Sequence, residues 1–285
     1  MGEKGSSEEP IETLSEFLES VKTIERPKDR FLTFRGQADA KWDMLPSIMR
    51  GDKNLLDHEK DIMREIISRY PYDFDQDSTT FDRLSRMQHY GIATRLLDVT
   101  TNPLVALYFS VAELTDAFIE PDGCVMTLNA PLSRRKFFDS DTVSCISNLS
   151  SLTQEEKETL TSSTARTISE FNSLKPAKRL LQFIKAEKPY FLPEIRREDL
   201  HTPFIVIPKL RNSRIISQHG AFMLFGLDRN AGPKYTRNII AKKIHISASA
   251  KKKLRLELET LGISDATLFP EIDKASAHLM SRLKA

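Results

Sequence analysis

The sequence predicts an α+β protein in which a central, mostly antiparallel sheet carries packed helices. Short apolar runs bounded by turn residues, which are typical of strands, occur at 31–34, 124–128 and 203–209. Stretches with the apolar spacing of helices lie before and between these runs, at 11–21, 54–70 and 103–114. Helices come first and strands mixed with helices follow, an order that favours an antiparallel sheet.

Composition limits the possible functions. The 285 residues, 40% hydrophobic and 29% charged, can bury a sizeable core as one large domain or two small ones. The 42 basic and 40 acidic residues leave a net charge of +2, too balanced for a general binder of nucleic acids or membrane surfaces, although a local basic groove stays open. Cys124 and Cys145 share no metal-ligand spacing, so we predict no metal site and no disulfide framework. A polar start and no apolar stretch near the roughly 18 residues of a membrane span predict a cytoplasmic protein with no membrane partner.

The N-terminal third is expected to be largely helical. Residues 1–29 are predicted to form a flexible tail and a helix that starts near Pro10, and the main domain is predicted to span 30–285. The stretch "FDRLSRMQHYG" is interpreted as a helix that ends at Gly91. Asn102 before Pro103 matches a helix N-cap followed by proline at the first helical position.

The C-terminal half is expected to mix strands with helices. Fifteen of the thirty-five residues from 140 to 174 are Ser or Thr, so residues 140–175 are predicted to be a surface insertion that is partly helical. The stretch "RIISQHGAFMLFG" (214–226) is interpreted as an apolar strand interrupted by polar residues. Leu254, Leu258 and Leu261 share one face of a last helix that ends at Gly262.

Arg35 is the first candidate functional residue. It follows the apolar run 31–34, so we expect it at the end of a strand, where its planar fork of donors can bind a phosphate or carboxylate. Gly36 would let a ligand approach the backbone. The alternative is that Arg35 forms a structural salt bridge with an acidic neighbour. Trp42, the only tryptophan, is expected to belong to the core.

The stretch "HYGIATRLLDVTTNPLVALYFS" (89–110) sets polar residues directly against an apolar run. We expect its first half to be a turn wedged against the core, in which Thr94, Asp98 and Thr100 satisfy backbone groups and one another. Rigid polar loops held by a core helix are common places for ligand sites. The alternative is that Arg95 and Asp98 form a buried pair that only stabilises the fold.

Two histidines and a glutamine complete the candidates. His89 has an ordinary pKa near neutrality and could act as a general acid or base, although a histidine at a helix end is more often a cap. His219 has the same two interpretations. Gln218, expected on a strand close to Gly220, could bond a sugar hydroxyl or a base edge.

Taken together, these segments resemble the FRG domain, a bacterial family defined by a Phe-Arg-Gly motif. The motif is Phe34-Arg35-Gly36, and the resemblance continues through Gln37, Trp42 and "LPS". It then includes "QHYGIATRLLDVTTNPLVALYFS", "RIISQHGAF" and "LETLGISDATLFPEID", over roughly residues 30–280. Members are often associated with mobile elements and phage defence, which implies no mechanism.

The order of these segments is also similar to the three-part NAD site of ADP-ribosyltransferases. By that resemblance Arg35 would bind the pyrophosphate, Thr94 and Thr100 would support the nicotinamide-ribose pocket, and Gln218 would hold the ribose hydroxyl. The late segment contains no carboxylate, so Asp98 would have to take that role. The catalytic set is then Arg35, Asp98 and Gln218, and the set of ligand-binding residues comprises Gly36, His89, Thr94, Arg95, Thr100 and His219.

Three functions therefore stay open. The first is an ADP-ribosyltransferase-like effector in phage defence that uses NAD as cofactor and modifies a protein or nucleic-acid target. The second is a non-catalytic sensor or adaptor whose pocket binds a nucleotide or a nucleic acid. The third, a nuclease or hydrolase using His89, His219 and Asp98, lacks a metal-ligand spacing. Basic runs such as 134–136 and 251–253 are interpreted as solvated faces.

Overall fold

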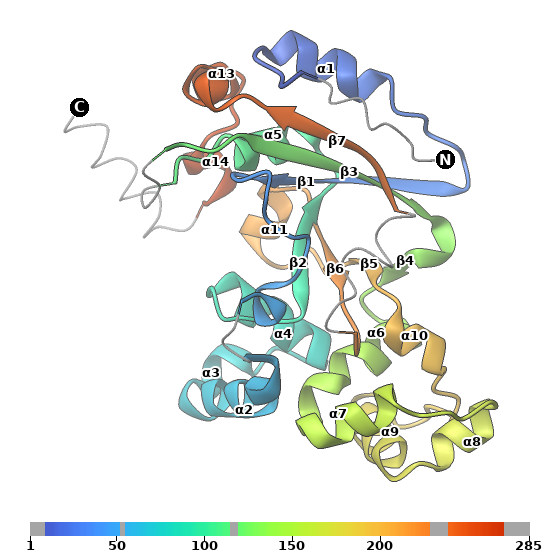
Figure 1. Ribbon diagram of the computed structural model, residues 1–285. Helices are drawn as coiled ribbons and strands as arrows, with labels where there is room; N and C mark the ends of the chain where they lie inside the picture. Colours follow the sequence, from blue (N-terminus) through green and yellow to red (C-terminus); the bar gives the residue numbers. More distant parts are fainter. Residues whose placement is uncertain (1–8, 52–54, 115–118, 229–238, 271–285) are drawn as a thin grey trace.

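A seven-stranded sheet forms the centre of the protein in a computed structural model that describes residues 9–51, 55–114, 119–228 and 239–270 (Figure 1). The strand order is β4-β5-β6-β2-β1-β3-β7, and neighbours are antiparallel except for the parallel pair β4 and β5. The strands are β1 (Arg30–Gln37), β2 (Leu96–Thr100), β3 (Gly123–Pro131), β4 (Arg135–Phe137), β5 (Phe204–Ile207), β6 (Gly220–Leu224) and β7 (Ile240–Ile246). The predicted α+β class and mostly antiparallel sheet are confirmed.

The sheet consists of two halves that run in different directions. Strands β1, β3 and β7 cross the upper part of the molecule, whereas β2 and β6 run down from them (Figure 1). Strands β1 and β3 are paired over eight residues, from Arg30 opposite Pro131 to Gln37 opposite Cys124. Strands β1 and β2 share one registered pair in the described chain, Phe34 opposite Thr100. Beyond that pair the two central strands diverge.

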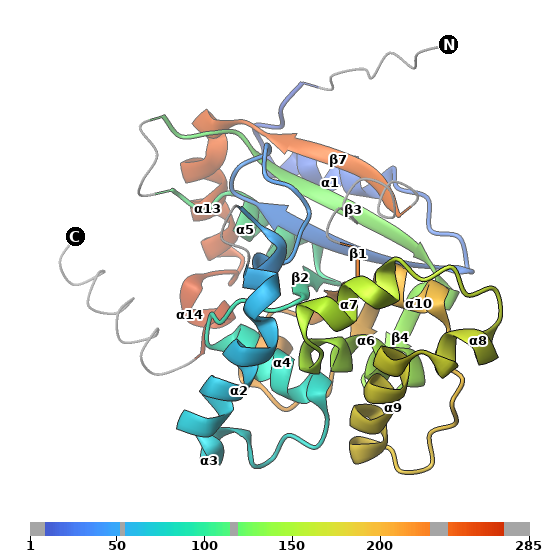
Figure 2. The ribbon, with the colours of Figure 1, turned by 60° about the horizontal axis from the view of Figure 1, so that its bottom comes forward.

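Four helices pack on the upper half, in which β7, β3 and β1 lie side by side (Figure 2). They are α1 (Leu14–Lys22), α5 (Pro103–Ser110), α13 (Lys251–Thr260) and α14 (Asp265–Leu268). Phe17 of α1, Phe34 of β1 and Leu254 of α13 belong to one buried cluster, so the N-terminal helix packs directly on the domain. The predicted Asn102 cap is confirmed, because its side chain accepts from the Leu104 amide and Pro103 opens α5.

Gly36 allows α5 to approach the sheet closely. A Cβ atom at Gly36 would lie 1.8 Å from the Ala106 carbonyl oxygen, and one at Gly123 would lie 2.1 Å from that of Ser110. No side chain fits at either distance, so these glycines let the helix backbone rest on β1 and β3. Gly36 thus has a packing role against α5, and its part in ligand approach stays a prediction.

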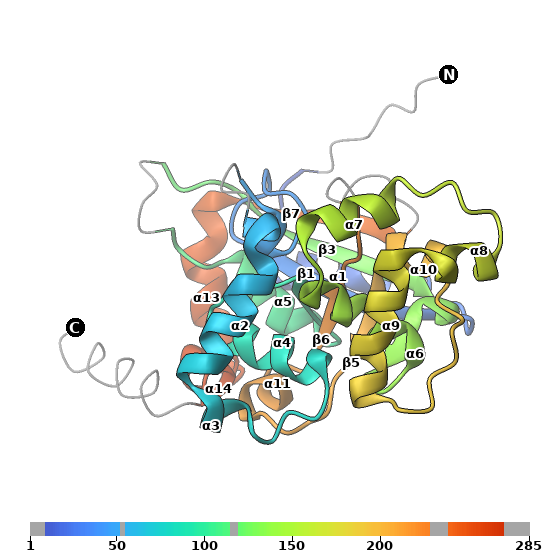
Figure 3. The same cartoon turned by 90° about the horizontal axis from the view of Figure 1, so that it is seen from below.

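The lower half of the sheet is covered by a larger group of helices (Figure 3). They are α2 (Glu59–Arg69), α3 (Pro71–Phe74), α4 (Thr80–His89), α6 (Asp141–Ser147), α7 (Gln154–Thr161), α8 (Ile168–Ser173), α9 (Lys175–Glu187), α10 (Arg197–His201) and α11 (Ser213–Ser217). Their core is a second cluster that includes Phe81, Leu149, Leu180 and Phe222. The predicted helix end at Gly91 is confirmed by its positive φ of 75°.

The Ser/Thr-rich segment is not confined to the surface. It forms α6, α7 and α8, and Ser144, Ser147 and Ser150 are almost fully buried. Ser150 donates to the Ser147 carbonyl at 2.7 Å, so this hydroxyl is satisfied by the backbone of its own turn. Val143 and Ile146 of the same segment belong to the lower core. The high Ser and Thr content predicted a surface location. Composition does not show that a buried serine hydroxyl can bond to the backbone of its own turn.

Three predicted elements differ from those observed. Strand β1 continues through Gln37, so Arg35 lies within it and not at its end. The stretch 96–100, predicted as a turn, is the central strand β2: Leu96 faces the lower core, whereas Leu97 and Val99 face a third cluster on the other side of the sheet. The stretch 214–226 divides into helix α11 and strand β6, so Gln218 and His219 lie in the connection between them.

The two ends of the described chain follow the prediction only in part. Ile11, predicted as part of the first helix, pairs instead with Ile246 in an isolated bridge. Gly262 has a φ of 80° just beyond α13, as expected of a helix stop. The tail at 1–8 and the last three residues of "LETLGISDATLFPEID" lie outside the described residues. None of the helices that the structure describes is long and apolar enough to cross a membrane.

Candidate functional site

A cavity of about 280 Å³ opens where β1 and β2 diverge. Its walls come from both strands, from the end of α5 and from α11. The lining residues are Phe34, Arg35, Gly36, Gln37, Ala38, Trp42, Asp98, Val99, Thr100, Phe109, Ala112, Leu114, Arg214 and Gln218. Five of the nine predicted site residues therefore lie at one cavity: Arg35, Gly36, Asp98, Thr100 and Gln218.

Arg35 reaches across the gap between the strands. Its Nη1 donates to the main-chain carbonyl of Asp98 at 2.6 Å, whereas its Nε is buried with no hydrogen-bond partner in the described part of the chain. The pKa of Arg35 is lowered to about 10, chiefly by burial; the nearby Arg50 adds to the lowering, and Asp98 opposes it. Arg35 is thus a desolvated cation with hydrogen-bonding capacity left over, the state in which a guanidinium gains most from binding an anion.

The carboxylate of Asp98 lies beside this guanidinium but is held by another residue. Asp98 is exposed, and its Oδ2 accepts from Nε2 of Gln88 at 2.9 Å. Gln88 lies on α4, which packs on β2. The cavity therefore presents a positive and a negative group within one small volume.

Thr100 and Gln218 connect the elements around the cavity. The Thr100 hydroxyl donates to the Gln218 carbonyl at 2.7 Å and accepts from the Asn102 amide at 3.0 Å. The Gln218 side chain donates to the Leu268 carbonyl at 3.0 Å, which fastens α14 to the end of α11. Because these groups are already engaged, both residues shape the walls of the cavity.

His89 lies next to the cavity. A neighbouring hollow of about 30 Å³ is lined by His89 and Gln88 and shares Asp98, Val99, Arg214 and Gln218 with the main cavity. The His89 ring packs edge-on against Tyr90 at 5.1 Å. His219 is exposed and does not line either hollow; it has a positive φ of 47°, and its carbonyl accepts from the Thr101 amide. The predicted ligand-binding role of His219 finds no geometric support.

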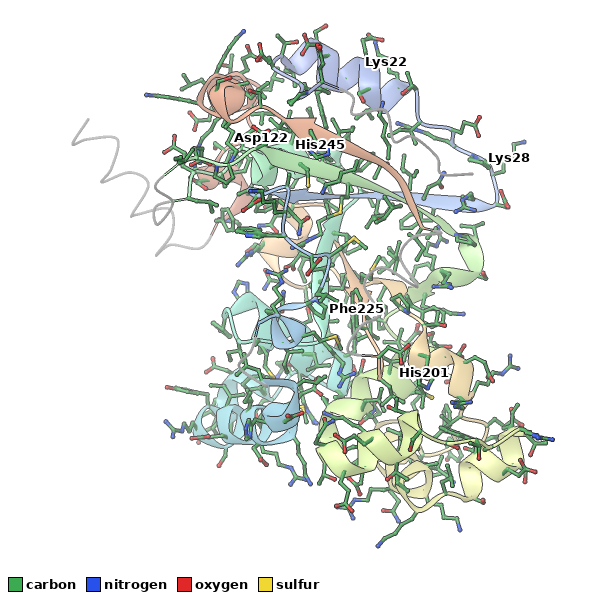
Figure 4. All side chains as sticks on the ribbon, viewed as in Figure 1. Lys22, Lys28, Asp122, His201, Phe225 and His245 are labelled. Atoms are coloured by element: carbon green, nitrogen blue, oxygen red, sulfur yellow. The ribbon has the colours of Figure 1, made fainter. Side chains whose placement is uncertain are left out.

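Arg95 does not line the cavity. It is almost fully buried and forms a two-pronged ion pair with Glu59, whose other partner is Lys157 at 2.7 Å. Its Nη1 donates to the carbonyls of Phe225 and Gly226 at 3.0 and 3.1 Å. Phe225 lies just after β6, toward the lower helices (Figure 4). Arg95 does not line the cavity, and the predicted pair with Asp98 is wrong, because Glu59 is its partner.

Thr94 supports the cavity from behind. It is fully buried, its hydroxyl donates to Oε1 of Gln88 at 2.7 Å, and the same oxygen accepts from the Leu96 amide at 3.2 Å. It does not line the cavity, so its predicted contact with a ligand is replaced by a contact with the residue that holds Asp98.

Arg214 and Trp42 are among the lining residues that were not predicted for the site. Arg214 contributes a second guanidinium, which stacks over the Phe269 ring at 4.8 Å. Arg214 and Gln218 are four residues apart, so recognising the helix at 213–217 would have placed both on one face. Trp42, predicted for the core, lines the cavity with 43% of its surface exposed. Its neighbours Lys41 and Asp43 are charged, which indicates an exposed loop.

An open groove beside β4, α6 and α10 holds none of the predicted residues. Its volume is about 1000 Å³, and its charged lining is mixed, with Arg134, Lys136, Lys188, Arg196, Asp141, Glu194 and Asp199 among others. Within the described ranges, no group of three or more His, Cys, Asp or Glu residues is arranged to hold a metal ion.

The fold and cavity define an α+β protein whose sheet opens around a small site with two guanidinium groups. The family model described as FRG domain matches residues 30–117, so the chain carries an FRG domain and the assignment made from its motifs is confirmed. The match spans β1 to α5 and includes Arg35, Gln88 and Asp98, whereas Arg214 and Gln218 lie beyond it. No curated protein and no solved structure matches the chain. The expected likeness to ADP-ribosyltransferases is therefore not supported.

Proposed function

We propose that the cavity between β1 and β2 binds a nucleotide. The observation that carries the proposal is Arg35, a half-buried cation whose Nε is buried without a partner in the described chain while its Nη1 donates to one carbonyl. A buried donor without a partner costs about 1–3 kcal/mol, and more when it is charged, so a bound anion would recover that cost.

The charge of the cavity favours an anionic ligand. Its described lining holds two guanidinium groups, Arg35 and Arg214, against the single carboxylate of Asp98. Arg50 lies close enough to affect the pKa of Arg35, which adds a third positive group nearby. Arginine forks match phosphate oxygens in two-pronged geometry.

The remaining walls favour an aromatic group on the same ligand. Phe34, Phe109 and the half-exposed Trp42 provide apolar and aromatic surface beside the guanidinium groups. The volume of about 280 Å³ lies near the lower limit of small-molecule pockets, roughly 300 Å³. This size suits a mononucleotide, or one half of a dinucleotide such as NAD.

Thermal stabilisation and calorimetry with purified protein test this proposal. The panel comprises the four ribonucleoside diphosphates, ADP-ribose, NAD and inorganic pyrophosphate. Arg35→Met should weaken binding of the best nucleotide by about 10- to 100-fold, the value of a charged hydrogen bond. Arg64→Met removes an exposed arginine of α2 and should leave affinity unchanged. No binding by any nucleotide, or equal binding by both variants, contradicts the proposal.

A second candidate is an enzyme that uses NAD, with Asp98 in the catalytic role. Asp98 favours it, because its carboxylate faces the cavity near Arg35 and could stabilise positive charge that develops on a ribose as nicotinamide leaves. Such an effector would fit the phage-defence association of FRG-domain proteins. Incubation with NAD should then release nicotinamide, and Asp98→Asn should abolish the release while binding persists. Binding of NAD without release favours the sensor or adaptor function.

A further inference from the structure

We propose that Gln88 and Thr94 are positioning residues that hold the Asp98 carboxylate to accept hydrogen bonds from the sugar hydroxyls of the ligand. This inference rests on the proposed nucleotide-binding function and names the part of the nucleotide that the site selects. It derives from a chain of hydrogen bonds that runs from the buried interior to the cavity.

The chain begins at Thr94, whose hydroxyl orientation is fixed. Its oxygen accepts from the Leu96 amide at 3.2 Å, so its own proton is free to donate to Oε1 of Gln88 at 2.7 Å. Thr94 is fully buried, and its amide donates to the Ser47 hydroxyl at 3.3 Å, which fixes the backbone as well. The threonine therefore determines which end of the Gln88 amide faces it.

Gln88 in turn fixes the position of the Asp98 carboxylate. Because Oε1 of Gln88 accepts from Thr94, its NH2 group must face outward, and it donates to Oδ2 of Asp98 at 2.9 Å. An amide turned the other way would place its oxygen against the Asp98 carboxylate and leave the Thr94 proton without an acceptor at Gln88. The pair thus holds one carboxylate oxygen in place although Asp98 itself is exposed.

The other carboxylate oxygen is available to a ligand. Within the described residues, Oδ1 of Asp98 has no protein hydrogen-bond donor, whereas the Asp98 carbonyl is taken by Arg35. An ionised carboxylate only accepts hydrogen bonds, so it attracts hydroxyl groups and repels phosphate. Of the parts of a nucleotide, the sugar with its neighbouring hydroxyls fits this position, while Arg35 and Arg214 suit the phosphates.

The hydrogen bonds that join Gln88, Thr94 and Asp98 account for the spacing of these residues in the sequence. Gln88, Thr94 and Asp98 fall within one stretch that turns from α4 into β2, so the turn at 90–95 brings the three side chains into line. A merely structural role would explain the bond between Gln88 and Thr94. It would not explain why this series of hydrogen bonds ends at the exposed carboxylate of Asp98 in the cavity.

The test compares each of the four ribonucleoside diphosphates with its 2′,3′-dideoxy counterpart by calorimetry. Wild-type protein should prefer the best ribonucleotide by roughly ten- to hundredfold, the range of a hydrogen bond to a charged group. Asp98→Ala should remove the preference, and Gln88→Met should reduce it several-fold with phosphate binding retained. Thr94→Val should act like Gln88→Met, whereas Thr94→Ser, which keeps the hydroxyl, should preserve the preference.

The ratio of the two affinities separates positioning from general damage, because a loss of folded protein lowers both equally. If Arg35-dependent binding occurs but wild-type protein does not distinguish the sugars, the inference is overturned and nucleotide binding stands. An unchanged ratio in Gln88→Met overturns the positioning role even if Thr94→Val fails to fold. If wild-type protein binds no nucleotide, both proposals are wrong.

Discussion

Two arginines near β2 differ in how their hydrogen-bond donors are satisfied. Arg95, just before β2, has a carboxylate on Glu59 and two backbone carbonyls for its donors. Arg35, beside the middle of β2, has one carbonyl and a buried Nε without a partner in the described chain. The difference is that a buried carboxylate completes the hydrogen bonds of Arg95, whereas the carboxylate near Arg35 is held by Gln88.

The largest expected effect comes from breaking the buried ion pairs of Glu59 with Arg95 and Lys157. Glu59→Gln leaves Arg95 and Lys157 buried without their common carboxylate, and breaking a buried ion pair in this way costs about 3–5 kcal/mol. Chemical denaturation measures the change in the free energy of unfolding. Glu65→Gln, which removes an exposed ion pair with Arg69, is the matched control and should change that free energy by less than about 1 kcal/mol. A similar loss of unfolding free energy in both variants would show that the buried ion pair of Arg95 stabilises the fold no more than an exposed pair does.

Acid should weaken the same cluster. Burial raises the pKa of Glu59, but Arg95 and Lys157 lower it by more, so its pKa in the folded protein lies below the ordinary 4.5. A lowered carboxyl pKa stabilises the protein above the unfolded pKa, and that stability is lost as the pH falls through the folded value. The free energy of unfolding should therefore fall more steeply below pH 4.5 in Glu65→Gln than in Glu59→Gln. Parallel pH curves for the two variants would contradict this assignment.

Gly36→Ala tests how tightly α5 packs on β1 beside the cavity. The added methyl would lie 1.8 Å from the Ala106 carbonyl oxygen, so α5 must shift, at a cost of about 1–3 kcal/mol. Gly220→Ala is the control, because its nearest contact would be an ordinary 3.4 Å. Thermal unfolding should show a clear loss for the first variant and little change for the second. An unchanged Gly36→Ala would mean that α5 is loosely seated.

Arg35→Met should have the smallest effect on stability. It removes a bond to the Asp98 carbonyl, but it also removes a desolvated charge, so the two changes nearly cancel, within about 1 kcal/mol. Arg95→Met should be strongly destabilising, since it leaves Glu59 buried with one partner fewer. Denaturation of the two variants in parallel measures the difference. Equal losses would show that Arg35 is a structural residue.

Local patterns predicted much of the fold but not the environment of β2. The helix caps at Asn102 and Gly91 and the strands at 31–34, 124–128 and 203–209 follow from short-range chemistry, and the structure confirms them. Strand β2 was missed because Arg95 and Asp98 look like loop residues, and their partners Glu59 and Gln88 come from other elements. Helix α11 was missed because its paired isoleucines favour a strand.

The candidate site was predicted by residue type more than by position. Arg35, Asp98, Thr100 and Gln218 were chosen as polar residues next to apolar runs, and they line one cavity. The same rule chose Arg95, which the sequence alone could not distinguish from Arg35. Only the tertiary fold shows that Glu59 reaches one arginine and not the other.

A single residue pair, Phe34 with Thr100, bridges the two halves of the sheet in the described chain. Apolar packing holds the halves together there, because a third cluster contains Leu97 of β2 and Met126 of β3. The cavity lies at this junction, where strand pairing between the halves is sparsest, so a molecule bound between Arg35 and Asp98 would add contacts that the backbone does not supply.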